Sequence, residues 1–308
     1  MKTMIWIASF FALAACAAAT AEAPPLSSDA QIAAAEQEPL GQMAMEGRWN
    51  EPFAPFKVMD DIYYVGTAGV SSWLITTPRG DVLIDGGVPQ TPPQIIANIH
   101  ALGFDIRDVK YLLNSHAHFD HAGGLAALQR ASGAQMVASE GDKPALEAGH
   151  VDYGPTAGVQ FPPIRVDRVV GEGDTLSLGG VTLTAHMIPG HTRGCTGWSM
   201  DAHGADGALH HVFFHCSATV AGASLVPEAY PGMIAAYRTT FARVRTIEAD
   251  VFLAPHAGFF DLQERRARQL AGDANAFVDA GALQRFNDEM ERQFNEELAR
   301  QQAVAAAR

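Results

Sequence analysis

The chain has 308 residues, of which 48 % are hydrophobic and 18 % are charged, and its formal net charge is −13 at pH 7. This length and composition are typical of a globular protein with one large core or two smaller ones. The acidic balance argues against nucleic acid or an anionic membrane as a partner, because both attract basic surfaces. An anionic small substrate stays compatible, since a bound metal ion can outweigh the global charge locally.

Residues 1–23 have the features of a secretory signal peptide. Lys2 precedes an apolar run from residue 4 to residue 15, which is too short to span a bilayer as a helix, and small residues follow. The run ends in the letters LAAC, which resemble a bacterial lipobox with Cys16 as the lipidated residue. Ordinary cleavage a few residues later, for instance after Ala21, is the alternative. We therefore expect an exported, periplasmic protein that contacts the membrane only through a possible lipid anchor.

Residues 24–48 are rich in Ala, Pro, Glu and Gln, which predicts a loose N-terminal arm before a single domain over residues 49–308. Apolar runs separated by turn residues predict strands within 56–66, 70–78, 81–87, 109–116 and 134–139. One helix is predicted within residues 91–103, where Thr91 would cap its start and Gly103 would end it. Another helix is predicted within residues 123–133.

The second half repeats this order of elements. Strands are predicted within 168–179, 181–191, 194–202, 210–220 and 251–256, with a helix within 232–250. From about residue 263 to the end, the Ala-, Glu-, Gln- and Arg-rich composition predicts helix. Two similar halves of alternating strands and helices indicate an α/β sandwich with two sheets inside and helices outside.

The two cysteines besides Cys16 lie on the predicted strands 194–202 and 210–220. The connection "HGADGA" contains Asp-Gly, which is typical of a hairpin turn. A turn centred between Ala205 and Asp206 would place Cys195 opposite Cys216. Because an exported protein meets oxidising conditions, a disulfide is favoured over two buried thiols.

Metal-binding side chains follow three separate predicted strands. They are His116, His118, Asp120, His121, His191 and His256. Functional residues of α/β folds gather on the loops at one edge of a sheet, so the three strand ends can converge on one site. Neutral imidazole with carboxylate is a common ligand set of catalytic zinc. Six ligands suffice for two ions with three protein ligands each and room for water.

The stretch "HAHFDHAGG", together with "VLIDGG", "GHT" and "PHAG", resembles the metallo-β-lactamase superfamily from about Trp49 to the last helix. The resemblance implies a four-layer αββα sandwich with zinc between the sheet edges. Many hydrolases of this superfamily carry an aspartate that bridges two metals, but no acid occurs here from His210 to Pro227. The stretch "CSATVAG" instead resembles the subclass B3 β-lactamases.

The B3 resemblance implies a role for each site residue. His116, His118 and His191 would bind the first zinc, and Asp120, His121 and His256 the second. Asp120 would also orient the nucleophile. Ser217 and Thr219 would bind substrate, and alternation along a strand would turn both away from the face of Cys216.

The implied activity is hydrolysis of the β-lactam amide bond of penicillins, cephalosporins and carbapenems by a metal-bound hydroxide, which confers antibiotic resistance. Two Zn²⁺ are the expected cofactors, the β-lactam is the expected partner, and a monomer is expected. Two alternatives stay open. One is a lactonase or thioesterase on the same fold, and the other is a zinc-binding protein without turnover.

Overall fold

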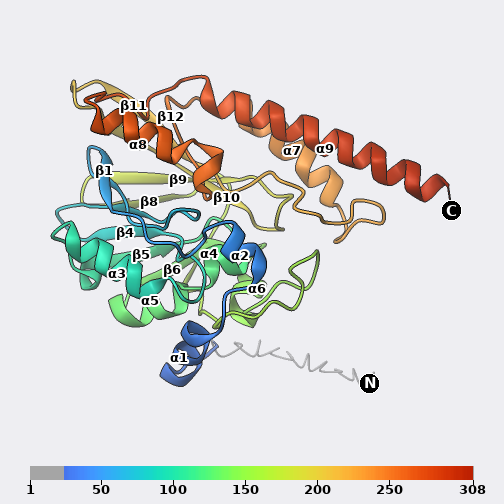
Figure 1. Ribbon diagram of the computed structural model, residues 1–308, viewed down its shortest axis with the longest axis horizontal. Coiled ribbons are helices and arrows are strands. Elements are labelled where there is room, and N and C mark those ends of the chain that lie inside the picture. Colours follow the sequence, from blue (N-terminus) through green and yellow to red (C-terminus); the bar gives the residue numbers. More distant parts are fainter. Residues whose placement is uncertain (1–23, 308) are drawn as a thin grey trace, which may run out of the picture.

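Two β-sheets pack face to face in the computed structural model of the chain, which describes residues 24–307 (Figure 1). The expected signal peptide, including Cys16, lies outside the described residues. The first sheet contains, in spatial order, β1 (Phe56–Met59), β2 (Ile62–Tyr64), β3 (Trp73–Ile75), β4 (Asp81–Ile84), β5 (Val109–Leu113), β6 (Gln135–Ser139) and β7 (Arg168–Val170). Neighbours are antiparallel from β1 to β4 and parallel from β4 to β7.

The second sheet contains β12 (Val251–Leu253), β11 (Leu209–Phe214), β10 (Thr196–His203), β9 (Val181–Met187) and β8 (Thr175–Leu178). Its strands are antiparallel except for β11 and β12. Helices α3 (Pro92–Ala101), α5 (Leu125–Ser132) and α6 (Lys143–Ala148) lie beside the first sheet. Helices α7 (Met233–Val244), α8 (Leu262–Leu270) and α9 (Ala282–Ala306) lie beside the second (Figure 1). The expected αββα sandwich is confirmed.

Side chains of the first sheet alternate between two apolar layers. Trp73 and Ile75 of β3 belong to the core between the sheets, which also contains Trp198 of β10. Leu74, between them, packs in the outer layer with Ile95 of α3. Because both faces of the strand are covered, it consists entirely of buried apolar residues. Burying each such side chain stabilises the fold by about 1.5–3 kcal/mol.

The N-terminal arm is ordered, unlike the loose arm that its composition predicts. It forms α1 (Asp29–Gln37) and α2 (Gln42–Glu46). Ser28 and Gln31 form a reciprocal capping box at the start of α1, and Ile32 is buried. Such a cap satisfies the first free N–H groups of a helix. The hydroxyl of Ser27 also donates to the carbonyl of Pro163, which ties the arm to the domain.

The hairpin of β10 and β11 is shifted by one residue from its predicted register. Trp198 pairs with Phe214, so the hairpin is centred on Asp206. Cys195 and Cys216 lie just beyond the two strands and are nevertheless joined by a disulfide, with their Cα atoms 5.8 Å apart. The disulfide therefore joins the segment before β10 to the segment after β11, at the end of the ladder, and not two residues paired in the predicted cross-strand register.

The C-terminal region forms two helices, where its composition predicts continuous helix. Residues 271–281 separate α8 from α9, and Gly272 adopts a left-handed conformation with φ of 100°. Glycine commonly ends a helix in this conformation. Within the interruption, Val278 forms a bridge to Val251 at the edge strand β12. Among the helices of residues 24–307, none is long and apolar enough to cross a membrane.

Candidate metal centre

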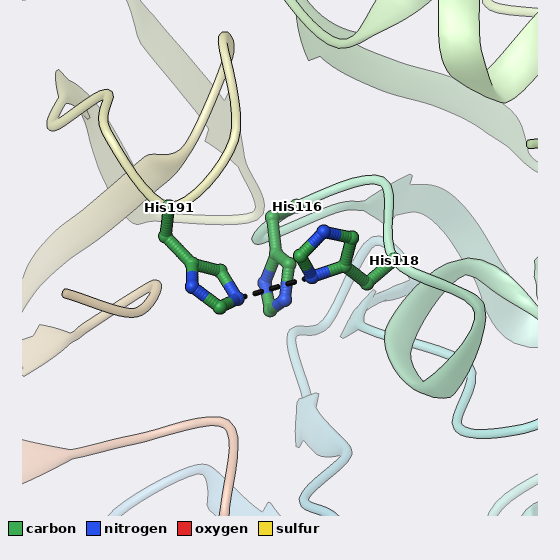
Figure 2. Close-up of side chains that lie close together, drawn as sticks. All are labelled: His116, His118 and His191. Carbon is green, nitrogen blue, oxygen red and sulfur yellow. Dashed lines mark hydrogen bonds between the residues drawn. The ribbon is translucent and has the colours of Figure 1, made fainter. Parts of the chain in front are cut away.

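Three loops bring the predicted ligands together at one edge of the sandwich. The first loop follows β5 and leads into α4 (Phe119–Ala122), and it carries the HxHxDH turn. The second follows β9 and carries His191, and the third follows β12 and carries His256. Figure 2 shows the imidazole rings of His116, His118 and His191 directed toward one another from the first two loops.

We define the first triad as His116, His118 and His191. One nitrogen of each ring lies within 4.8 Å of the others. Nδ1 of His118 is 3.0 Å from Nε2 of His191. Nε2 of His116 is buried and has no hydrogen-bond partner. Zinc–nitrogen bonds of 2.0–2.1 Å in tetrahedral geometry place two ligand atoms about 3.3 Å apart. The first triad is therefore spaced to hold one metal ion.

We define the second triad as Asp120, His121 and His256. Oδ2 of Asp120 lies 3.1 Å from Nε2 of His121 and 3.4 Å from Nε2 of His256. The two imidazole nitrogens are 3.3 Å apart. All three separations match the spacing of ligand atoms around one tetrahedral ion. His116 also lies close to Asp120 and His121, so the two triads adjoin.

The pKa values of the first triad favour neutral imidazoles. Burial, together with the charge of His191, lowers the pKa of His118 to about 3. Burial also lowers the pKa of His191 to about 4 and that of His116 well below its usual value. Because a metal binds only the deprotonated ring, these three histidines are in the ligand form at neutral pH.

The second triad is electrostatically different, because it contains a carboxylate. Burial opposes the positive charge of His121, but Asp120 and Asp85 outweigh burial and raise its pKa to about 10. Burial alone would raise the pKa of Asp120, yet the adjacent histidines hold it well below the usual range. This triad thus favours positive charge, which a divalent ion supplies.

Asp85 supports the turn that carries four of the six side chains. Its carboxylate accepts hydrogen bonds from the backbone N–H of Ser115 at 2.7 Å and from the hydroxyl of the same residue at 2.6 Å. It also lies 3.5 Å from Nδ1 of His121, so Nε2 of that ring faces the second triad. Asp85 belongs to the stretch "VLIDGG", but its role was not predicted from the sequence. Its position directly after an apolar strand was the available signal.

His191 is oriented from the opposite side of the centre. Its Nδ1 lies 2.7 Å from the carbonyl oxygen of Thr219, which directs Nε2 toward the first triad. The hydroxyl of Tyr237 on α7 donates to the same carbonyl at 2.7 Å. The hydroxyl of Tyr230 donates to the carbonyl of Gly190 at 2.8 Å. Partners of this kind fix the tautomer and the orientation of a ligand. No spacing pattern in the sequence identifies the two tyrosines.

A cavity of about 710 Å³ opens above the two triads. His118, Asp120, His191 and His256 contribute to its lining. Aromatic side chains form much of its wall, among them Trp49, Phe119, Tyr153 and Phe259. Among the described residues that line it, none is Lys or Arg. This combination of an apolar wall and a few convergent polar groups is typical of small-molecule sites.

The two predicted substrate-binding hydroxyls are placed differently. Thr219 lines the cavity. Ser217 is 1 % exposed and does not belong to the lining, although its hydroxyl oxygen is 3.2 Å from that of Thr219. Both residues lie beyond β11, which ends at Phe214, yet their hydroxyls face each other while Cys216 bonds to Cys195, as the predicted alternation requires.

Comparisons with known proteins agree with this fold. The family model of the metallo-β-lactamase superfamily matches residues 65–204. The crystal structure of BJP-1, a subclass B3 metallo-β-lactamase of Bradyrhizobium japonicum, has a TM-score of 0.81 and 42 % identity, with 85 % of this chain and 99 % of that chain covered. A metallo-β-lactamase of Cronobacter sakazakii has a TM-score of 0.79 and 38 % identity, with 83 % and 98 % covered.

A curated relative of another activity also matches. The acyl-coenzyme A thioesterase MBLAC2 of Gallus gallus is 30 % identical over 155 residues, which are 45 % of this chain and 56 % of that protein. The match thus spans little more than half of that relative. The chain belongs to the metallo-β-lactamase superfamily, and its solved structural neighbours include subclass B3 enzymes. Its fold and its His/Asp cluster identify it as a metal-dependent hydrolase with a divalent-metal site.

Proposed function

We propose that this protein uses two zinc ions to hydrolyse the amide bond of β-lactam antibiotics. The observation that carries the proposal is the ligand arrangement below the cavity. Each triad offers three protein ligands, which leaves each ion an open position, as catalytic zinc requires and structural zinc does not. This arrangement argues against a zinc-binding protein without turnover.

The missing bridging carboxylate supports a β-lactam over other substrates of this fold. The cavity lining contains three carboxylates, those of Asp120, Asp261 and Glu264, and none comes from the segment after β11. A bridging aspartate would cancel one further positive charge of the ions. Without it, the centre keeps more positive charge, which attracts the carboxylate that penicillins, cephalosporins and carbapenems carry. No lysine or arginine of the described lining competes for that role.

Zinc bound at the triads would polarise the lactam carbonyl and lower the pKa of water toward about 7. The chain's own residues contribute position and charge. Asp120 would hold the second ion through its carboxylate, and it also lines the cavity. Thr219 lines the same cavity, so its hydroxyl can donate to the substrate carboxylate. The aromatic wall around Trp49 and Phe119 excludes water and holds the apolar part of the substrate.

A thioester or lactone substrate is the second candidate, because the matching relative MBLAC2 is an acyl-coenzyme A thioesterase. The deciding experiment compares hydrolysis of a carbapenem, a homoserine lactone and an acyl-coenzyme A by the purified protein, each with and without a zinc chelator. We expect chelator-sensitive loss of the carbapenem. Lactone or thioester cleavage without β-lactam turnover would refute the proposed substrate and leave the metal centre intact.

We further propose that the protein acts in the periplasm and confers antibiotic resistance, since the targets of β-lactams lie there. The sequence of residues 1–23 supports this proposal. Expression in a susceptible Gram-negative host, followed by cell fractionation, tests it. A Cys16→Ala variant that still reaches the periplasm but loses lipid labelling would identify a lipid anchor at Cys16.

A further inference from the structure

Asp142 is a buried carboxylate that connects two of the three loops of the metal centre. It is 2 % exposed and precedes α6, but its side chain does not cap that helix. Its Oδ2 accepts hydrogen bonds from the backbone N–H of Ala117 at 3.0 Å and from the hydroxyl of Thr192 at 2.8 Å. Its Oδ1 accepts from the N–H of Gly194 at 2.9 Å.

Two of the three donors are sequence neighbours of the first triad. Ala117 lies between His116 and His118, and Thr192 directly follows His191. One carboxylate therefore forms hydrogen bonds with both chain segments that carry the first triad. His118 and His191 come from different loops, so contacts between the loops must set the 3.0 Å between their nitrogens.

The backbone around Asp142 packs closely against the backbone of residues 193–194. A Cβ atom on Gly194 would lie 2.2 Å from the backbone nitrogen of Asp142, and one on Gly141 would lie 2.5 Å from the carbonyl oxygen of Arg193. The hydroxyl of Ser139 donates to the carbonyl of Gly194 at 2.6 Å. A buried carboxylate costs several kcal/mol unless hydrogen bonds compensate it. Asp142 receives three hydrogen bonds, and they lie where the two backbones approach so closely that glycines are required. This arrangement indicates that the carboxylate has a specific structural role.

We propose that Asp142 is a positioning residue that holds the first triad at the spacing that one metal ion requires. Its hydrogen bonds reach the loops of His116, His118 and His191, and none of them reaches the loop of His256 among the described residues. Asp120 and His121 share one turn with Ala117 and so keep their mutual spacing, whereas the first triad depends on the bridge between the two loops, so loss of the carboxylate weakens the first triad. The proposal rests on metal binding by the cluster and not on the identity of the substrate.

The test measures zinc affinity by competition with a chromophoric chelator. Asp142→Asn keeps the size of the side chain but replaces one oxygen acceptor with an NH₂ group, which cannot accept a hydrogen bond from the N–H or O–H groups that face it. In a His256→Ala background, where the first triad is intact, we expect zinc affinity to fall about 10- to 100-fold, as is typical when a partner that orients the ligands is lost. In a His118→Ala background, where the second triad is intact, the same substitution is expected to leave affinity unchanged.

Further variants separate positioning from general destabilisation. Thr192→Val removes one of the three hydrogen bonds and is expected to cause a smaller loss, whereas Thr192→Ser keeps the hydroxyl and restores affinity. Asp167→Asn is the matched control, because Asp167 also accepts from a backbone N–H, that of Met136 at 2.9 Å, and from the side chain of Gln129 at 3.0 Å, away from the ligands. It is expected to leave zinc affinity unchanged.

Either of two results overturns the proposal. The first is an Asp142→Asn protein with wild-type affinity at the first triad. The second is an equal loss at both triads, which would indicate a general effect on the fold. Because the measurement is metal binding, a protein that fails to hydrolyse β-lactams would still give a decisive answer about Asp142.

Discussion

The two triads of the metal centre differ in the means by which each would hold an ion. The first consists of three imidazoles whose pKa values burial lowers, so it offers a neutral site whose affinity depends on spacing. The second contains Asp120 and lies beside Asp85, so it attracts positive charge directly. The first triad therefore needs contacts between loops, whereas the second needs its carboxylate.

The largest effect is expected from Asp120→Ala. The substitution removes the only carboxylate of the second triad, so the second ion should be lost while the first is retained. A catalytic metal contributes several kcal/mol to stabilising the transition state, so kcat/KM should fall on the order of 10³-fold. Metal analysis and steady-state kinetics check both. Asp201→Asn, at an exposed aspartate paired with His211, is the control. Full activity with two bound ions in the Asp120→Ala protein would refute this role.

The disulfide should support the first triad. It joins Cys195, four residues after His191, to Cys216, three residues before Thr219, whose carbonyl orients His191. A Cys195→Ala/Cys216→Ala protein should lose about 3 kcal/mol of unfolding free energy, because the bridge closes a loop of roughly 20 residues. Denaturant unfolding measures the loss. Zinc affinity at the first triad should also fall, and a variant that unfolds like the wild type would contradict this role.

Proton release should distinguish the triads at pH 6. The pKa of His121 is raised to about 10, so the ring is protonated at pH 6 and an ion must displace about one proton from the second triad. The pKa values of about 3 for His118 and about 4 for His191 lie below pH 6, so these rings are already neutral and an ion should displace almost none. Calorimetric zinc titrations in two buffers of different ionisation enthalpy measure the release.

The His118→Ala protein isolates the second triad for this titration, and the His256→Ala protein isolates the first. Low pH keeps water at the metal mostly protonated, so its ionisation adds little to the release. Equal proton release in the two proteins would contradict the electrostatic difference between the triads.

The sequence predicted those parts of the centre that follow a local pattern. The HxHxDH spacing and the placement of His191 and His256 after strands indicated one cluster, and the structure brings all six side chains together. Their function as ligands stays a prediction. Asp85 and Asp142 were not assigned a role, because each accepts hydrogen bonds from groups far away in the sequence, which leaves no spacing pattern between donor and acceptor.

The local errors have physical causes as well. The hairpin register depends on how many residues the turn uses, which the letters "HGADGA" leave open by one residue. Ser217, which the resemblance implied as a substrate-binding residue, is buried beyond the end of β11 and stays out of the cavity lining, a matter of packing that no sequence pattern shows. The capping box of Ser28 and the burial of Ile32 order an arm whose overall composition predicts a loose chain.

The smallest effect is expected at the hydroxyls beside the first triad. Thr219→Val removes a hydroxyl that lines the cavity but keeps the carbonyl that orients His191. One hydrogen bond to a charged group contributes about 1.5–3 kcal/mol, so KM for a carbapenem should rise on the order of tenfold, while kcat and zinc content change little. Ser217→Ala is the matched control and should leave KM nearly unchanged, because Ser217 is buried outside the lining. If Ser217→Ala raised KM more than Thr219→Val, the substrate carboxylate would have to bind on the side of Ser217, and the cavity would have to open there on binding.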